Sequence, residues 1–181
     1  AAVLSTCNRT EVFAVAERFH GAYADIRDFF CELGGMQPDE LHPHLYSQHD
    51  DAAVSHLFEV AAGLDSAVLG ESEILGQVRS AWEIAQAEGG TKATLNLLFR
   101  HAIETGKRAR TETSIGRHTA SVSHAAVEMA HERLGGIAGR RVLVVGAGEM
   151  GEGIAVALVG AGATDITVTN RTQARAAQLA Q

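Results

Sequence analysis

The stretch that decides the fold is Arg141–Gly151, which reads RVLVVGAGEMG. Its first half, Arg141–Val145, is a nearly all-apolar run of the kind that forms a strand buried in a parallel sheet. The second half is a complete GxGxxG directly after that strand, made of Gly146, Ala147, Gly148, Glu149, Met150 and Gly151. In such a turn the first glycine allows the tight bend, the second lets the backbone approach a pyrophosphate, and the third lets helix and strand pack closely. The following helix adds N–H donors and a favourable dipole for the anion.

The residues after this turn complete one strand–helix–strand unit. Residues 152–161 are predicted as a helix and Ile166–Thr169 as a second strand, with another helix from Thr172 onward. In that context the glycine turn predicts a nucleotide-binding site of Rossmann type. The alternative is that the glycines serve a tight turn without a ligand.

The end of the second strand indicates which dinucleotide the site takes. NAD-binding folds usually place an acidic residue there to hold the ribose hydroxyls. This chain has Asn170, Arg171 and Thr172 instead. Arg171 can pair with a 2′-phosphate and its two neighbours can hydrogen-bond to it, so the pattern favours NADPH over NADH. The alternative is that Arg171 is an ordinary surface residue at a helix start.

The part of the chain before this unit is mostly helical in pattern. Val3–Ser5 and Glu11–Glu17 read as short strands around a polar turn. Five helices are expected. The first contains Ile26 to Leu33, and the second begins at Asp50 or Asp51 and has a buried stripe of Val54, Leu57, Phe58 and Ala61. The other three cover Ser72–Gly89, Lys92–Arg110 and Ser121–Leu134. The predicted class is therefore α/β. An α+β domain over residues 1–116, incomplete at its start, precedes a Rossmann-like domain over residues 117–181, incomplete at its end.

Composition and charge exclude several classes of protein. The chain has 181 residues, a formal net charge of −7 and 46% hydrophobic residues. No stretch approaches the roughly 20 uncharged apolar residues of a membrane span, and the opening residues lack the basic region of a signal peptide. The acidic balance argues against a nonspecific nucleic-acid binder. A nucleic acid would have to bind locally, at the basic residues Arg100, Lys107, Arg108, Arg110 and Arg117. The alternative is that this basic run is only a solvated helix face.

The chain holds two cysteines, which form neither a disulfide framework nor a CxxC metal pair. Reduced thiols are typical of a cytoplasmic protein. Cys31 lies in an apolar helical run and fits a core or inert surface cysteine rather than a nucleophile. Cys7 follows a strand and is flanked by Thr6, Asn8 and Arg9, and a neighbouring guanidinium favours the thiolate, the form that attacks carbonyls. A thiol together with NADPH suggests one chemistry, in which an acyl group is taken as a thioester and then reduced to an aldehyde.

Four blocks of this sequence resemble a known family. Leu4–Glu11 (LSTCNRTE) resembles the catalytic-cysteine segment of the glutamyl-tRNA reductases, and Gly63–Val78 (GLDSAVLGESEILGQV) resembles that family's most characteristic segment. Arg108–Ile115 (RARTETSI) and the turn Gly146–Gly151 follow in the family's order and at its spacing. The resemblance covers essentially the whole chain.

The resemblance implies NADPH-dependent reduction of glutamyl-tRNA to glutamate-1-semialdehyde, the first step of tetrapyrrole (porphyrin, 5-aminolevulinate) biosynthesis. It implies that Cys7 attacks the aminoacyl ester, that His56 acts as a general base or polarises the carbonyl, and that Arg9 binds the glutamate side-chain carboxylate. The implied substrate-binding residues are Thr6, Cys7, Asn8, Arg9, Ser66, Glu71, Ser72, Glu73 and Gln77. No metal site is implied. Without the family, His56 would be a structural histidine, and Ser66 and the acidic residues would only cap or start a helix.

The family also implies parts beyond this chain: a preceding strand and helix, the rest of the NADPH-binding sheet, and a C-terminal dimerisation helix. We therefore expect a fragment that is weakly stable or inactive alone, whose full-length relatives form homodimers and contact the downstream semialdehyde aminomutase. Two alternatives are another NADP-dependent oxidoreductase of shikimate-dehydrogenase-like type and a non-catalytic tRNA- or partner-binding protein. The cysteine block and Gly63–Val78 speak against the first, and the retention of Cys7, Arg9 and the motif glycines speaks against the second.

Overall fold

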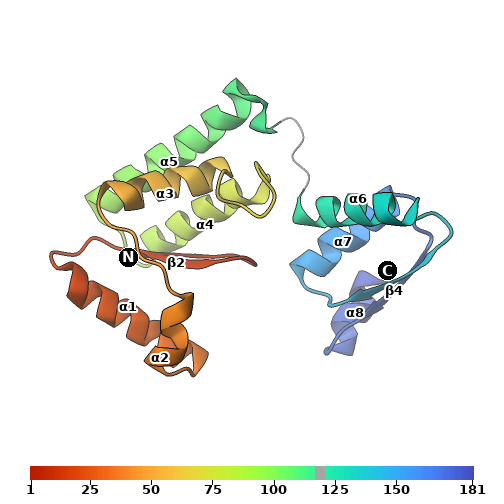
Figure 1. Cartoon of the computed structure of the whole chain (residues 1–181), viewed down its shortest axis with the longest axis horizontal. Coiled ribbons are helices and arrows are strands. Elements are labelled where there is room, and N and C mark those ends of the chain that lie inside the picture. The colour runs from red at the N-terminus through yellow and green to blue at the C-terminus, as the bar shows by residue number, and fades with distance from the viewer. Residues whose placement is uncertain (117–120) are drawn as a thin grey trace. The chain divides into compact units, whose positions relative to one another are not determined.

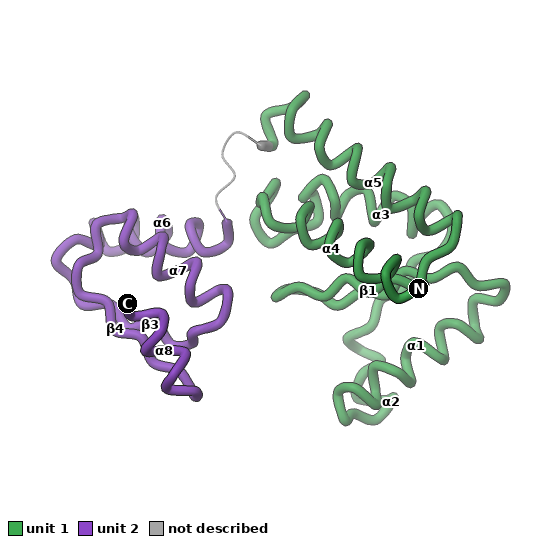
Figure 2. The backbone as a smooth tube through the Cα atoms, turned by 180° about the vertical axis from the view of Figure 1, so that it is seen from behind, with its two compact units in different colours: residues 1–118 green, residues 119–181 purple. Residues whose placement is uncertain are grey.

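The computed structural model describes residues 1–116 and 121–181 of the chain. The chain folds as two compact units, residues 1–118 and residues 119–181 (Figure 1, Figure 2). The predicted domain boundary after residue 116, and Arg117 of the basic run, fall on residues outside the described part. No helix within the described ranges is long and apolar enough to cross a membrane.

The first unit begins with a β-hairpin. Strand β1 (Ala2–Ser5) pairs antiparallel with β2 (Thr10–Phe13), with Ala2 opposite Phe13. The side chains on its inward face are those of Ala2, Leu4, Glu11 and Phe13. The second strand is shorter than the predicted Glu11–Glu17, because the pairing with β1 ends at Phe13.

Helices follow the hairpin and build the core of this unit. They are α1 (Phe19–Gly34), α2 (Pro38–Leu41), the 3-10 turn η1 (His42–His44), α3 (Asp51–Ala62), α4 (Glu73–Ala87), α5 (Ala93–Glu112) and the 3-10 turn η2 (Ser114–Gly116). Helix α3 packs on α5, and α4 packs on β1, around one apolar core. The ring of Phe99 in α5 meets Phe13 edge-on with centroids 5.5 Å apart, which anchors the hairpin to the helices.

One expected burial pattern in the first unit is wrong. Helix α1 has no buried residue, and Cys31 within it is half-buried, as an inert cysteine outside the core can be. In α3, Leu57 and Ala61 are buried as predicted, but Val54 is 42% exposed. The spacing of apolar residues identifies a helix, but it does not show how much of that helix other elements cover. Helix α1 packs mainly against the short α2 and therefore stays largely uncovered.

The second unit is a parallel strand pair with helices beside it. Its elements are α6 (Val122–Leu134), β3 (Arg141–Val145), α7 (Glu149–Gly160), β4 (Asp165–Thr169) and α8 (Gln173–Leu179). The two strands run parallel with Val145 opposite Thr169, which confirms the predicted strand–helix–strand unit and the α/β class. Helix α6 packs on α7, and the core of this unit consists of Val127, Ile137, Val144, Ala157, Leu158 and Ala163.

Strand β3 is less buried than its apolar sequence predicts. Val144 is 6% exposed, whereas Leu143 is 62% and Val145 is 78% exposed. Within the described residues the sheet consists of β3 and β4. One face of β3 therefore meets the core beside α7, and the face that carries Leu143 and Val145 is open.

Candidate functional site

Cys7 lies at the tip of the β1–β2 hairpin. The N–H of Thr6 donates to Arg9 O at 2.8 Å and closes the turn. The Thr6 hydroxyl accepts from the N–H groups of Asn8 and Arg9, both at 3.1 Å. The Cys7 side chain is exposed. Thr6 thus shapes the turn that displays the thiol, as a threonine hydroxyl commonly does in a tight turn.

Arg9 extends from the same turn toward the loop between α3 and α4. Its Nη1 donates to Asp65 Oδ2 at 2.9 Å and to Glu11 Oε1 at 3.2 Å, and its Nη2 donates to the backbone oxygen of Asp65. Burial works against its charge, but the hydrogen bond to Asp65 and the charge of Glu11 outweigh this effect, so the pKa of Arg9 is raised above its ordinary value. The hydrogen bonds of the guanidinium therefore go to carboxylate and carbonyl oxygens rather than to the Cys7 thiol.

A buried carboxylate organises the side chains around His56. Glu11 is 7% exposed, and its Oε1 accepts from the Tyr46 hydroxyl and lies 3.0 Å from His56 Nε2. The Tyr46 ring meets the imidazole edge-on with centroids 5.8 Å apart. Burial and the hydrogen bond to Glu11 raise the pKa of Tyr46 well above its ordinary range. On the other side of the ring, His56 Nδ1 lies 3.7 Å from Asp65 Oδ2, so the imidazole stands between two carboxylates.

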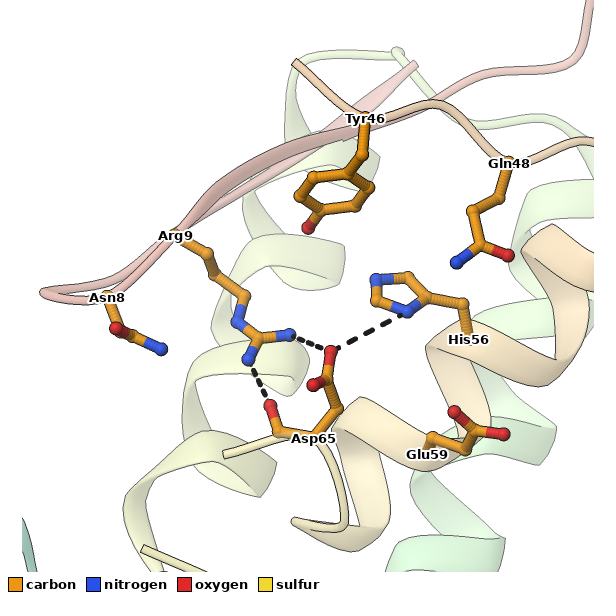
Figure 3. Close-up of a pocket in the computed structure, with 7 residues that line it drawn as sticks. All are labelled: Asn8, Arg9, Tyr46, Gln48, His56, Glu59 and Asp65. Atoms are coloured by element: carbon orange, nitrogen blue, oxygen red, sulfur yellow. Dashed lines mark hydrogen bonds and ion pairs between the residues drawn. The ribbon is translucent and has the colours of Figure 1, made fainter. Parts of the chain in front are cut away.

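These side chains line an open pocket of about 490 Å³ (Figure 3). The lining consists of Asn8, Arg9, Tyr46, Gln48, His56, Glu59 and Asp65. Of the residues predicted from the sequence, the pocket brings together Asn8, Arg9 and His56. A concave site with several convergent polar groups is the natural candidate for ligand binding.

The other predicted residues of the first unit lie outside this lining. They are Thr6, Cys7, Ser66, Glu71, Ser72, Glu73 and Gln77. Ser66 is a half-buried residue of the α3–α4 loop and caps no helix. The Glu71 carboxylate accepts from the N–H of Glu73 at 2.8 Å and from the N–H of Ile74 at 2.9 Å, so it caps the first turn of α4.

Sequence patterns missed most of the residues that surround Arg9 and His56. The missed residues are Glu11, Tyr46, Gln48, Glu59 and Asp65. Strand alternation carries one usable signal, because it places Glu11 on the inward face with Phe13, and a buried carboxylate needs partners. Tyr46 and Asp65 carry no such signal, since both lie in loops that only folding brings beside β2.

Two glycines fix the loop that carries Asp65. The N–H of Gly70 donates to Gly63 O at 2.7 Å and closes this loop, and both glycines have positive φ angles of 74° and 79°. A Cβ on Gly70 would lie 2.5 Å from Ile115 O. The second and third sequence blocks therefore pack directly against each other.

In the second unit, the glycine turn has the geometry that its sequence predicts. Gly146 has a φ of 114°, and its N–H donates to Thr169 O at 2.7 Å. A Cβ on Gly151 would lie 2.1 Å from Gly146 O, so only glycine fits there. Gly148 is the N-cap of α7 and has open space where a side chain would be. The turn and the helix start fit a dinucleotide pyrophosphate.

The end of β4 is linked to this turn by Asn170. Its Oδ1 accepts from the N–H of Ala147 at 3.3 Å, and its Nδ2 donates to Thr172 O at 3.0 Å. The Asn170 amide is therefore engaged with backbone groups, whereas the Arg171 side chain is exposed beside it. Glu149 forms the first turn of α7 with Met150. Within residues 1–116 and 121–181, no group of three or more His, Cys, Asp or Glu side chains is placed to hold a metal ion.

Comparison with known proteins identifies the family. The family model described as the N-terminal domain of glutamyl-tRNAGlu reductase matches residues 1–113, which carry Cys7 and the whole pocket. The chain belongs to the glutamyl-tRNA reductase family. A second family model, described as shikimate / quinate 5-dehydrogenase, matches residues 128–181, the strand–helix–strand unit.

Named relatives extend the likeness along the chain. Glutamyl-tRNA reductases of Paenibacillus macerans and Staphylococcus carnosus (strain TM300) are 48% and 49% identical over 98% and 99% of this chain. The chain covers 41% and 40% of those proteins, so it spans about two-fifths of the length of the curated relatives that it matches. A solved glutamyl-tRNA reductase from Methanopyrus kandleri is 47% identical, with a TM-score of 0.45 over 74% of this chain and 33% of that one.

Family membership confirms the resemblance seen in the four sequence blocks. A shikimate-dehydrogenase-like enzyme accounts for residues 128–181 but not for the match over residues 1–113, so this alternative is not favoured. The pocket of Arg9 and His56 and the hairpin tip with Cys7 lie in the segment that matches the N-terminal domain of glutamyl-tRNA reductase. The glycine turn lies in the segment that matches the second family model.

Proposed function

We propose that the full-length protein containing this chain reduces glutamyl-tRNA to glutamate-1-semialdehyde with NADPH, as the first step of tetrapyrrole biosynthesis. Residues 1–116 act as the catalytic domain, and residues 117–181 begin the NADPH-binding domain. The observation that carries the proposal is the hairpin tip, where an exposed Cys7 directly precedes Asn8 and Arg9, two residues that line a polar pocket.

Arg9 is suited to recognise the side-chain carboxylate of glutamate. A guanidinium has five N–H donors, and three donate to Glu11 Oε1, Asp65 Oδ2 and Asp65 O. Two donors therefore have no protein acceptor within the described residues. Two parallel N–H groups match the two oxygens of a carboxylate, which gives orientation as well as affinity.

Cys7 acts as the nucleophile. Its thiolate sulfur attacks the carbonyl carbon of the aminoacyl ester, a carbon–sulfur bond forms, and the bond to the ribose oxygen of the tRNA breaks. The products of this step are a thioester on Cys7 and free tRNA, whose ribose oxygen takes up a proton. His56 serves as the proton-transferring or carbonyl-polarising group, held in place by Glu11 at Nε2.

The other substrate contacts implied by the family divide into two kinds. Ser66, Ser72, Glu73 and Gln77 keep exposed or half-buried side chains that a ligand can reach, and they are retained as binding residues together with Thr6 and Asn8. Glu71 differs, because its two carboxylate oxygens are engaged with the first N–H groups of α4. It contributes by positioning the start of that helix.

NADPH is assigned to the glycine turn of the second unit. The close approach at Gly151 and the open space at Gly148 fit a pyrophosphate on the start of α7. The exposed guanidinium of Arg171 supplies a cation for a 2′-phosphate. When bound there, the dinucleotide supplies the hydride that converts a thioester to an aldehyde. Loss of Arg171 should therefore weaken NADPH binding more than NADH binding.

Trapping of the acyl-enzyme tests the proposal. The full-length protein is incubated with tRNA charged with labelled glutamate in the absence of NADPH, then denatured, digested and analysed by mass spectrometry. We expect one labelled peptide, carrying the glutamyl group on Cys7. Cys7→Ser should abolish the label, and the control Cys31→Ser should keep it. Label on Cys31, or none from a protein that still forms the semialdehyde, would refute the mechanism.

A further inference from the structure

Three side chains meet one oxygen of the buried Glu11 carboxylate. Its Oε1 accepts from the Tyr46 hydroxyl and lies 3.2 Å from Arg9 Nη1 and 3.0 Å from His56 Nε2. The other oxygen, Oε2, is buried and has no hydrogen-bond partner among residues 1–116 and 121–181. The adjacent guanidinium stabilises the carboxylate over the acid, and a proton on Oε2 would have no acceptor. Glu11 is therefore a carboxylate, which only accepts hydrogen bonds.

Two of the three side chains hold this carboxylate as fixed donors. The guanidinium of Arg9 has no acceptor atom. Burial and the hydrogen bond to Glu11 raise the pKa of Tyr46, so its phenol keeps the proton that it donates. The Tyr46 ring also meets the imidazole edge-on, with centroids 5.8 Å apart. The third contact of Oε1 must then be an N–H of His56, which places a proton on Nε2.

The other ring nitrogen of His56 has a different environment. Nδ1 lies 3.7 Å from Asp65 Oδ2, whereas a hydrogen bond needs about 2.7–3.2 Å. That oxygen accepts from Arg9 Nη1 at 2.9 Å instead, and Figure 3 shows the Asp65 carboxylate between Arg9 and His56. The Asp65 side chain is 53% exposed, and an N–H on Nδ1 would draw such a carboxylate into hydrogen-bond range. The gap therefore indicates a lone pair on Nδ1.

We propose that Glu11, held by Tyr46 and Arg9, is a positioning residue that keeps the neutral ring of His56 protonated on Nε2 and leaves the lone pair of Nδ1 to the pocket. In a histidine, the hydrogen bond of one ring nitrogen decides which nitrogen carries the proton. A lone pair accepts a proton and has none to donate to a carbonyl oxygen. Of the two roles proposed for His56, proton transfer is therefore the one that this ring can begin.

The tautomer rests only on the contacts of Glu11, whereas its use in the reaction rests on the proposed function. Nδ1 takes the proton of the Cys7 thiol, and the electron pair of the S–H bond stays on sulfur as the thiolate. After the sulfur attacks the aminoacyl carbon, the same proton passes from Nδ1 to the ribose oxygen as the carbon–oxygen bond breaks. Between the two transfers, Glu11 stabilises the imidazolium through Nε2. The ring ends in the tautomer in which it began.

Nuclear magnetic resonance of the full-length protein tests the tautomer directly. The protein is labelled with ¹⁵N in its histidines, and long-range ¹H–¹⁵N correlations distinguish a protonated ring nitrogen from one with a lone pair. The signals of His56 are assigned by their loss in His56→Asn. At mildly alkaline pH we expect a proton on Nε2, with a downfield proton signal from its bond to Glu11, and a lone pair on Nδ1. A proton on Nδ1, alone or together with Nε2, would overturn the proposal.

Two variants of Glu11 test whether it sets this state. Glu11→Ala removes the acceptor, so both neutral tautomers should appear and the Nε2 proton signal should be lost to exchange with water. Glu11→Gln keeps an oxygen acceptor without the charge, so the proton should stay on Nε2 and its signal should move upfield. At saturating glutamyl-tRNA, we expect thioester formation to slow about ten- to hundredfold in Glu11→Ala and by less in Glu11→Gln. If His56 signals in Glu11→Gln match those of the wild type, Glu11 does not have this role.

A matched control separates the hydrogen bond from the charge of the pocket. Glu59→Gln removes an exposed carboxylate that lines the same pocket, and we expect the His56 signals to stay those of the wild type. A shift as large as that of Glu11→Gln would show that pocket charge, and not the bond to Glu11, governs the ring.

The result is separable from the proposed reaction. The expected tautomer in a protein that forms no thioester from glutamyl-tRNA would sustain the role of Glu11 and refute the proposed function. A thioester on Cys7 in a protein whose His56 carries its proton on Nδ1 would do the reverse.

Discussion

At the scale of single residues, Arg110 shows how one side chain joins segments that are distant in the sequence. Its Nη1 donates to Ala61 O at 2.9 Å and to Gly106 O at 3.0 Å, and its Nη2 donates to Glu71 O at 2.9 Å. Burial lowers the pKa of Arg110, and the charge of Glu71 offsets this only in part. Arg110 thus ties the end of α3 to the start of α4, and it is not available to the phosphate backbone of a nucleic acid.

Replacement of Arg110 should therefore destabilise the first unit. Arg110→Lys keeps the charge but cannot reach three carbonyl oxygens, and we expect a loss on the order of 2 kcal/mol in the free energy of unfolding. The measurement is urea denaturation followed by the fluorescence of Trp82, the single tryptophan of the chain. Arg108→Lys is the matched control in the same helix, because Arg108 pairs with Glu112 on an exposed surface. Equal midpoints for the two variants would contradict this role of Arg110.

At the scale of elements, the helices of the first unit pack at a glycine. A Cβ on Gly106 in α5 would lie 2.5 Å from Ala61 O and 2.8 Å from Leu75 Cδ1. Gly76 in α4 has no atom within 4 Å of the same position. The two glycines look alike in sequence, since both interrupt a helical pattern, but only Gly106 permits close contact between neighbouring helices.

The two glycines should respond to alanine with opposite signs. Gly76→Ala should stabilise the protein by about 0.5–1 kcal/mol, because alanine favours a helix interior over glycine. Gly106→Ala gains the same helix propensity, but the clash with the end of α3 should outweigh it and give a net loss of about 1–3 kcal/mol. Thermal unfolding of both variants checks the signs. A stabilised Gly106→Ala would mean that α3 and α5 are less tightly packed than described.

At the scale of the whole molecule, the chain consists of two units whose hydrophobic cores differ in size. The first unit buries side chains from the hairpin and three helices in one cluster. The second has a small core around Val144 and exposes Leu143 and Val145 on its sheet. A smaller unit buries a smaller fraction of its surface and is less stable for that reason.

We expect this 181-residue chain to unfold in two steps, with the second unit first. Trp82 reports only the first unit, where its Nε1 donates to Asn96 Oδ1 at 2.9 Å, while far-ultraviolet circular dichroism reports helices of both units. In urea, the dichroism should begin to fall before the fluorescence changes. Val144→Ala should shift the early step alone. Coincident transitions by both probes would show that the two units unfold as one.

Much of the local structure could be predicted from the sequence. The strand–turn–helix around Gly146, the hairpin turn at Cys7 and the helices from α3 to α7 follow from short windows, because turn chemistry and helical or strand period act between neighbours in the chain. The expected site residues Asn8, Arg9 and His56 do meet in one pocket. Their assignment came from the family resemblance, since spacing alone gives no reason for them to meet.

By itself, the sequence determined the α/β class, the glycine turn and the position of the exposed thiol, since each depends on residues within one turn or strand. The tertiary structure alone decided the partners of Arg9 and His56, because Glu11, Tyr46 and Asp65 come from a strand and two separate loops. It also decided which apolar faces are covered, leaving α1 without a buried residue and one face of β3 exposed. The physical reason is that burial and ion pairing depend on which surfaces meet in space. The periodicity of residues within one helix or strand does not indicate which other element packs against it.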